Sequence, residues 1–405
     1  MRIKYQSMKG GSLQGTTLAV RVIRSTAELE QERLLWKAWP GHRDSDLDFY
    51  LMVLRSRLEV ISPYVLVLYR NGLPLSIWIG RLEQTHLTFR IGYLSVCRPN
   101  VRLLSLIPWG RRGDESTECS QALIAEVLRL LKDGEFDVAN LGFVDAHSIL
   151  CRLARELPGT LSRDVLPSRS AHWKMDLAGN IDEIYRRFSS DYRGQLRRKA
   201  KKLIAEFGEN IRVVCLREPS DVERIVEDVE LVAKKTYQRG LGVGFSVSDE
   251  TWNRLRFQAE KFWLRAFILY IEDQPCAFWV GALYDGVFYS DYLGHDPAYD
   301  RHSIGTFLTT KAIESLCSEG GKQIDFGPGD SRYKRQFGTS NSEELSIFIF
   351  APSLKGMVLN CGRTIFGCID WILREGFKRT DIPQRIKKMW RKRATEVGQF
   401  VATPK

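Results

Sequence analysis

The sequence predicts an α+β protein of two similar tandem domains, each a mixed, mostly antiparallel sheet flanked by helices, followed by a basic helical extension. Three observations support this fold class: the chain length, a hairpin pattern that occurs twice, and the order of elements after each hairpin. The chain has 405 residues, of which 44% are hydrophobic and 27% are charged. That composition is ordinary for globular proteins, and the length suits two domains.

The repeated pattern is a β-hairpin. In the first half, the strand-like run 64–70 is followed by Asn71-Gly72, a strong hairpin signal, and by a returning strand at 73–82. The runs 266–271 and 275–283 have the same character in the second half. Shared residues at one constant spacing, without a gap, indicate an internal duplication. The matching pairs are Leu68 and Leu269, Tyr69 and Tyr270, Pro74 and Pro275, Trp78 and Trp279, Gly80 and Gly281, and Leu82 and Leu283.

Each hairpin is followed by a strand, a helix and a short strand that ends in a polar residue and a glycine. In chain order these are 86–94, 119–132 and 137–142 in the first half, and 287–293, 303–319 and 322–327 in the second. Antiparallel strands joined to a further strand through a crossover helix are typical of an α+β domain. We therefore expect a polar tail at 1–17, domains at 18–168 and 169–352, and the basic helical extension at 353–405.

Cysteine and histidine usage argues against a metal or disulfide framework. None of the eight cysteines forms a C-x-x-C pair, and the six histidines show no ligand spacing. We expect no metal cofactor and reduced thiols, as in the cytoplasm. No apolar run reaches the length that spans a membrane, and residues 1–20 lack the apolar core of a signal peptide.

The net charge of +11 favours acidic partners, and much of it lies in two blocks. In the first block, Arg193, Arg197 and Lys201 recur on one helix face, where they could hold an anionic acceptor. The second block lies in a helix expected at 384–394, which could contact the inner surface of the membrane. The alternatives are a solvated face for either block, and a helix that packs on the second domain.

A turn in the second half has the features of a phosphate site. Arg301, Ser303, Gly305 and Thr306 lead into the N-terminus of a helix, where free N–H groups and the helix dipole favour an anion. We assign these four residues to donor binding. The alternative is an ordinary helix start with Ser303 as its N-cap. The stretch assigned as its equivalent in the first half, 97–100, has a proline and no glycine, so we expect the first domain to be a degenerate copy.

A polar cluster follows the last strand of the second half. Asp325 ends that strand, a Gly-Pro-Gly turn follows, and a short helix carries Tyr333 and Lys334. A carboxylate could take a proton from an attacking nucleophile, and a phenol could return one to a leaving thiolate. We assign catalytic roles to Asp325, Asp330 and Tyr333, and acceptor binding to Arg193, Arg197 and Lys334. The alternative is that Asp330 caps the helix and Tyr333 packs in the core.

These segments together resemble a known family. The block 193–202, Trp279-Val-Gly281, 325–330 and Tyr333-Lys-x-x-Phe-Gly338 are similar to the signature of the CelD-like acetyltransferases of the GNAT superfamily. They are more distantly similar to the Fem-type aminoacyl transferases. The resemblance covers 18–352 and implies two GNAT-like domains with acetyl-CoA or another acyl-CoA as donor. The turn Arg301-x-x-x-Gly305 departs by one residue from the Arg/Gln-x-x-Gly-x-Gly/Ala turn of GNAT enzymes and has only one glycine.

Three functions are compatible with these features. The first is a cytoplasmic acyltransferase, peripheral to the membrane or free, that acts on an amine or hydroxyl in envelope or polysaccharide metabolism. The second is a Fem-type transferase that uses aminoacyl-tRNA, whose RNA binding would weaken steeply with salt. The third is a non-catalytic scaffold that recruits a polysaccharide synthase through 384–394.

Overall fold

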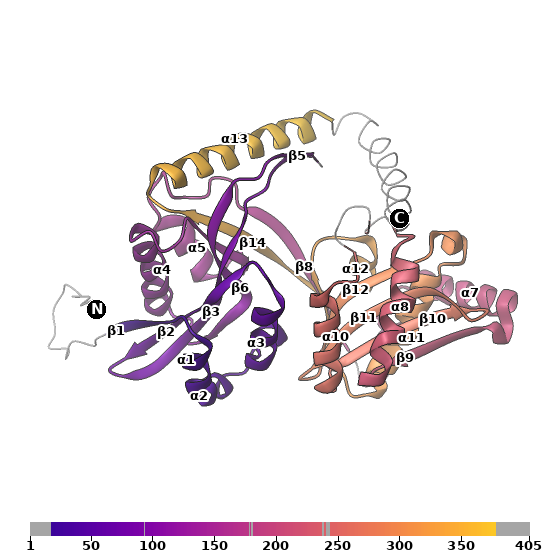
Figure 1. The fold of residues 1–405 in the computed structure, drawn as a ribbon. Helices are drawn as coiled ribbons and strands as arrows, with labels where there is room; N and C mark the ends of the chain where they lie inside the picture. The colour runs from indigo at the N-terminus through magenta and orange to yellow at the C-terminus, as the bar shows by residue number, and fades with distance from the viewer. Residues whose placement is uncertain are drawn as a thin grey trace, which may run out of the picture. The chain divides into compact units, whose positions relative to one another are not determined.

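The computed structural model describes residues 18–92, 94–177, 179, 181–236, 239 and 244–377 (Figure 1). They form two compact units. The first contains the described residues up to Ala171 and those from Ser342 onward, and the second contains His172–Asn341. The predicted tail at 1–17 and the predicted basic helix at 384–394 lie outside the described residues.

The first unit contains one half of a 12-stranded sheet, and helices cover this half on both faces (Figure 1). Strands β6 and β7 are parallel, and the other neighbouring pairs are antiparallel. In spatial order the strands are β1 (Leu18–Ile23), β2 (Val60–Arg70), β3 (Leu73–His86), β6 (Asn100–Gly113), β7 (Val138–Asp145) and β14 (Ser340–Phe350). The short strands β4 (Phe89–Ile91) and β5 (Leu94–Cys97) form a separate hairpin.

Alternate residues of strand β2 contribute to two hydrophobic clusters of this unit, one on each face of the sheet. Leu66 and Leu68 pack toward α4 (Thr117–Lys132) and α5 (Ile149–Glu156). Val65 and Val67 pack on the opposite face, because successive side chains of a strand point to opposite sides. That face is covered by α1 (Thr26–Gln31), α2 (Arg33–Ala38) and α3 (Leu47–Ser56), with the short helix η1 (Arg43–Ser45) between the last two.

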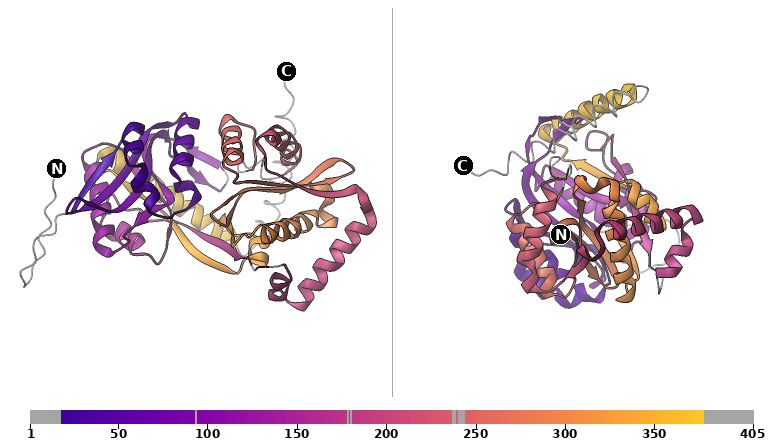
Figure 2. Two further views of the ribbon diagram at one scale, coloured as in Figure 1. Left: turned by 90° about the horizontal axis from the view of Figure 1, so that it is seen from below. Right: turned by 90° about the vertical axis from the view of Figure 1, so that its right-hand side faces the viewer.

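The second unit has the same plan. Its sheet has the order β8 (Ser168–Asp176), β13 (Gln323–Pro328), β12 (Val287–His295), β11 (Gln274–Tyr284), β10 (Leu264–Ile271) and β9 (Ile211–Leu216), with β12 and β13 parallel. Helices α6 (Ile181–Arg187), α7 (Ser190–Phe207) and α11 (Ile304–Ser318) cover one face. Helices α8 (Val222–Ala233) and α10 (Asp249–Glu260) cover the other face, so the sheet lies between two helical layers (Figure 2).

The two hairpins share one register, which confirms the predicted repeat. Leu66 lies opposite Trp78 in the first, and Phe267 lies opposite Trp279 in the second. Both hairpins also bulge before the shared tyrosine, at Leu68/Tyr69 and at Leu269/Tyr270. Neither hairpin has room for a side chain at the shared glycine. A Cβ at Gly281 would lie 2.6 Å from the Phe288 ring, and one at Gly80 would lie 2.9 Å from Leu106.

The structure corrects the assignment of the third strand in the first half. Strand β6 pairs with β3 and runs parallel to β7, as β12 pairs with β11 and runs parallel to β13. The predicted strand 86–94 instead covers the end of β3 and most of the β4–β5 hairpin. The turn that leads into α4 is therefore 114–116, and not 97–100 as the sequence pattern predicted.

The C-terminal part of the chain also differs from the prediction. The sequence pattern placed residues up to 352 in the second domain, whereas strand β14 pairs with β7 of the first unit, where Phe348 lies opposite Asn140. Helix α13 (Leu354–Phe377) continues in the first unit, and Phe366 stacks on Phe89 of β4. The described part of the extension, 353–377, therefore belongs to the first unit. None of the helices in the described ranges is long and apolar enough to cross a membrane.

Candidate active site

The second unit contains a pocket of about 630 Å³ bounded by α7, the N-terminus of α11 and the helix α12 (Arg332–Phe337). It brings together five residues that the sequence pattern singled out. Three were assigned to the donor and two to catalysis: Ser303, Gly305, Thr306, Asp330 and Tyr333. Tyr192, Gln195 and Lys199 of α7 line the same pocket.

The N-terminus of α11 is open toward an anion. Ser303 occupies the N-cap position in the left-handed region, with φ of 56°, and its hydroxyl makes no capping hydrogen bond. Ser303 is therefore the N-cap residue, as the alternative held, but its side chain does not cap the helix. First-turn N–H groups of a helix have no partner within the helix. At Gly305 an added Cβ would lie 3.3 Å from the His295 ring, so the glycine leaves backbone accessible where a side chain would be tight.

The Gly-Pro-Gly turn after β13 is held from two sides. Gly327 and Gly329 have φ of 69° and 101°, in the region that favours glycine. The Gly327 N–H donates to Asp325 Oδ1 at 2.8 Å. From the other side, Lys334 Nζ donates to the carbonyls of Gly327 and Pro328, at 2.9 Å each. This turn determines where the next residues, Asp330 and Tyr333, enter the pocket.

Asp325 and Lys334 are not among the residues that line the pocket. Asp325 is 4% exposed, and its Oδ1 lies 2.6 Å from Nε2 of the equally buried His172. Asp330 is open to solvent, pairs with Arg335 Nε at 3.0 Å and accepts from Trp173 Nε1 at 3.3 Å. Tyr333 packs edge-on against Phe326, with ring centroids 5.8 Å apart. Asp330 and Tyr333 thus face the pocket, whereas Asp325 and Lys334 support the turn that carries them.

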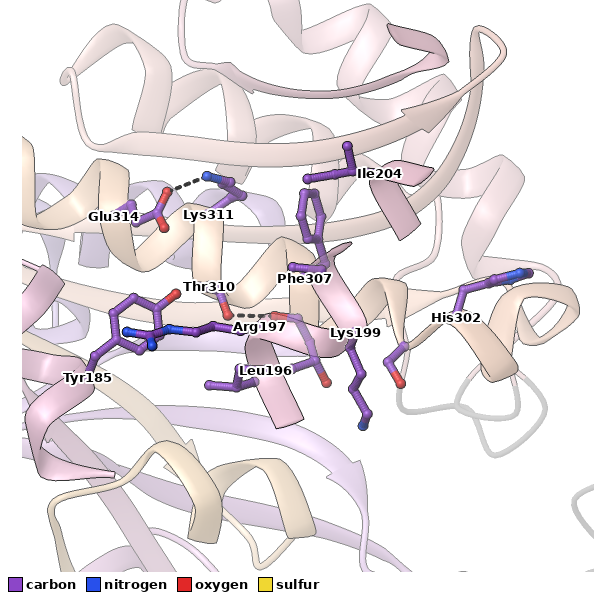
Figure 3. A pocket seen from close by; sticks show the side chains of 13 residues that line it. Tyr185, Leu196, Arg197, Lys199, Ile204, His302, Phe307, Thr310, Lys311 and Glu314 are labelled. Carbon is purple, nitrogen blue, oxygen red and sulfur yellow. Dashed lines mark hydrogen bonds and ion pairs between the residues drawn. The ribbon is translucent and has the colours of Figure 1, made fainter. Parts of the chain in front are cut away.

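The three arginines assigned to binding have different surroundings. Arg193 donates to the carbonyl of Phe188 at 2.9 Å, which caps the end of α6. Arg301 extends into solvent near Glu206, and its side chain is 77% exposed. Arg197 lines a smaller cavity of about 140 Å³ between α7 and α11, together with Tyr185 (Figure 3). Thr306 and Lys199 line both this cavity and the larger pocket.

Sequence reasoning missed His172, Tyr192 and Lys199. His172 lies far from Asp325 in the chain, and only the antiparallel pairing of β8 with β13 brings the two together. In the sequence, a single histidine that belongs to no motif gives no indication that it pairs with a distant carboxylate. Lys199 lies inside the predicted basic block, but a charge count does not say which member faces a pocket. No group of His, Cys, Asp and Glu that could hold a metal occurs in the described part of the chain.

The Lys334 amine should make the stability of the protein depend on pH. Burial is the larger effect on this amine and lowers its pKa to about 8. The negative charges of Asp325 and Asp330 act in the opposite direction and raise the pKa. In the unfolded chain the pKa of a lysine amine is about 10.4. Between these values the unfolded chain binds more protons, so native stability rises with pH.

The wild type and Lys334→Met should therefore be compared by urea denaturation from about pH 7 to about pH 10. The free energy of unfolding of the wild type should rise relative to the variant above about pH 8, by at most about 1.4 kcal/mol per pH unit. Below about pH 7 the difference between them should be constant. A difference independent of pH throughout would contradict the lowered pKa.

Comparisons with known proteins concern the family and the fold. Residues 190–335 match the model of the family described as "Acetyltransferase (GNAT) domain". The structure of FemX is similar in fold, with a TM-score of 0.52 and 11% identity, over 82% of this chain and 97% of that one. No curated protein sequence matches.

Two further solved structures align over most of the chain. One is a conserved protein of unknown function from Bacteroides thetaiotaomicron, with a TM-score of 0.49 and 9% identity over 79% of this chain and 97% of that one. The other is a tandem GNAT protein from the clavulanic acid biosynthesis pathway, with a TM-score of 0.44 and 10% identity over 83% of this chain and 99% of that one. By the family match, the second unit carries a GNAT-type acetyltransferase domain, and the protein is an acyltransferase.

Proposed function

We propose that the protein moves an acyl group, acetyl in the simplest case, from acyl-CoA to an amine or hydroxyl acceptor. The observation that carries this proposal is one pocket in which an uncapped helix N-terminus lies close to a phenol and a carboxylate. The resemblance to the CelD-like group adds that the acceptor belongs to envelope or polysaccharide metabolism. Under this proposal the first unit is a degenerate copy of the domain and does not carry out acyl transfer.

The N-terminus of α11 would hold the pyrophosphate of the donor. Backbone N–H groups near Gly305 and Thr306 and the helix dipole favour negative charge there. Lys199 adds a positive charge at the same pocket. Asp330 would accept the proton of the attacking amine or hydroxyl, and Tyr333 would return one to the leaving thiolate. Holding both reactants in one pocket supplies much of the rate in such a transfer.

Calorimetric titration with acetyl-CoA, longer acyl-CoAs and free CoA tests the donor. We expect dissociation constants in the micromolar range, lost in Gly305→Glu, because a carboxylate there would fill the anion site and repel it. Gly305→Ala is the matched control and should keep most of the affinity, since the partly exposed His295 ring can shift by the few tenths of an ångström that the methyl group needs. If no CoA species binds, the acyl-CoA donor is excluded.

A second candidate is the Fem-type use of aminoacyl-tRNA as donor. The observation that favours it is the basic face of α7, where Arg197, Arg198, Lys199, Lys201 and Lys202 are all exposed. A polyanion bound there should dissociate steeply as salt is raised, because each phosphate contact releases counterions. Weak binding of tRNA that does not respond to salt would count against this candidate. Binding of neither tRNA nor CoA would leave only the scaffold role.

We also propose that the protein acts in the cytoplasm, with contact to the inner membrane surface through residues 384–394. The support within the described residues is a row of exposed apolar side chains on α13: Leu354, Val358, Ile365, Trp371 and Ile372. The sequence that follows this helix is dense in lysine and arginine. Apolar side chains next to cationic ones suit an anionic lipid surface.

A further inference from the structure

The first unit has a pocket of its own, of about 550 Å³. Its walls come from β6, β7 and the start of α5, with Gly41 and His42 from the segment before η1. The parallel pairing of β6 with β7 runs from Leu103 and Val138 to Leu106 and Leu141, and the pocket lies beyond the end of this pairing. Nothing in the acyl-transfer proposal uses this cavity.

Two large aromatic residues of this pocket have an unusual backbone conformation. Trp109 on β6 and Phe143 on β7 have φ of 54° and 49°. The left-handed region is unfavourable for bulky side chains, and such residues concentrate at binding and catalytic sites, where the surroundings enforce them. Their rings are stacked with centroids 6.1 Å apart. Trp109 Nε1 donates to Glu344 at 3.0 Å, which fixes the ring at the pocket wall.

Hydrogen-bond donors and acceptors line the pocket beside these rings. Arg111 lines the pocket and donates to Ser120 Oγ at 2.8 Å and to the Asp114 carbonyl at 2.9 Å. Its buried Nε–H has no hydrogen-bond partner among the described residues. Glu115 and Asp145 add carboxylate acceptors to the lining. The pocket therefore offers an aromatic wall with donors and acceptors beside it.

The pocket is a poor site for a phosphate. The N-terminus of α4, which corresponds in topology to that of α11, is closed by its own side chains. Ser116 Oγ accepts from Cys119 N at 3.4 Å, and Asp114 Oδ1 accepts from Ser116 N at 2.7 Å. Glu115 and Glu118 place further negative charge there. An anionic donor such as CoA would meet carboxylates where the second unit offers free N–H groups.

We propose that this pocket of the first unit binds a saccharide. A sugar ring has an apolar C–H face that packs on an aromatic side chain, and hydroxyls that both donate and accept hydrogen bonds. The Arg111 guanidinium would donate to a hydroxyl or to a sugar carboxylate, and Glu115 and Asp145 would accept from hydroxyls. The volume lies within the range of small-molecule sites.

Saturation-transfer NMR on the full chain tests this proposal, with cellohexaose as the neutral probe and tri-galacturonate as the acidic one. We expect at least one probe to bind, with affinity lowered about tenfold or more in Trp109→Ala and largely kept in Trp109→Phe, which retains an aromatic ring. Trp371→Ala, on the exposed face of α13, is the control for loss of a tryptophan. Circular dichroism would show whether each variant is folded.

Three results would overturn the proposal: binding of neither probe, binding unchanged in Trp109→Ala, or CoA binding that is lost in Trp109→Ala. A preference for the acidic probe that disappears in Arg111→Gln would support it and assign the guanidinium to a sugar carboxylate. The test does not involve acyl transfer, so its failure and a failure of the acyl-CoA proposal are distinguishable.

Discussion

The Tyr333→Phe variant should turn over about 10²–10⁴ times more slowly than the wild type, with the binding of acyl-CoA little changed. The ring packs against Phe326 and remains in place in the variant, so only the hydroxyl is lost. If that hydroxyl protonates the leaving thiolate, its loss affects the transition state more than the bound donor. Release of free CoA thiol, followed with a chromogenic disulfide, gives kcat and KM for both proteins.

Tyr185→Phe is the matched control, because Tyr185 lines the smaller cavity and not the active-site pocket. It should keep wild-type turnover. Asp330→Asn belongs to the same experiment, since its amide oxygen can still accept from Trp173 while the carboxylate base is gone. Wild-type rates in both Tyr333→Phe and Asp330→Asn would refute the catalytic roles assigned to these two residues.

The second large effect concerns stability. Asp325→Ala should lower the free energy of unfolding by about 2–5 kcal/mol, because it removes the carboxylate beside Nε2 of the buried His172 ring. The same change removes the acceptor for the Gly327 N–H, and so loosens the turn before Asp330. Urea denaturation of the wild type and the variant measures the difference.

Asp330→Ala is the matched control for this prediction. Asp330 is a solvent-exposed carboxylate, so its removal should change the free energy of unfolding by only about 0.5 kcal/mol. An Asp325→Ala variant that is as stable as the wild type but inactive would contradict the structural role. That outcome would favour the direct catalytic role that the sequence pattern suggested for Asp325.

Local patterns in the sequence determined much of this protein. The Asn71-Gly72 hairpin and its second copy specify their own registers, because turn geometry and alternating apolar residues set the pairing of adjacent strands. The segments 303–306 and 325–333 could be assigned to one site for a related reason. They follow the neighbouring parallel strands β12 and β13, whose C-terminal ends lie at the same edge of the sheet.

Only the tertiary structure decided which distant segments meet. That β14 pairs with β7, far away in the chain, depends on a strand edge that neither strand's own sequence specifies. Likewise, the partner of Asp325 comes from β8, and Arg193 caps α6, which a count of charges on a helix face does not reveal. The spacing of apolar residues predicts which side of a short segment is buried. Side-chain partners across strands depend on packing between segments far apart in the chain, and so they lie beyond what a local pattern can specify.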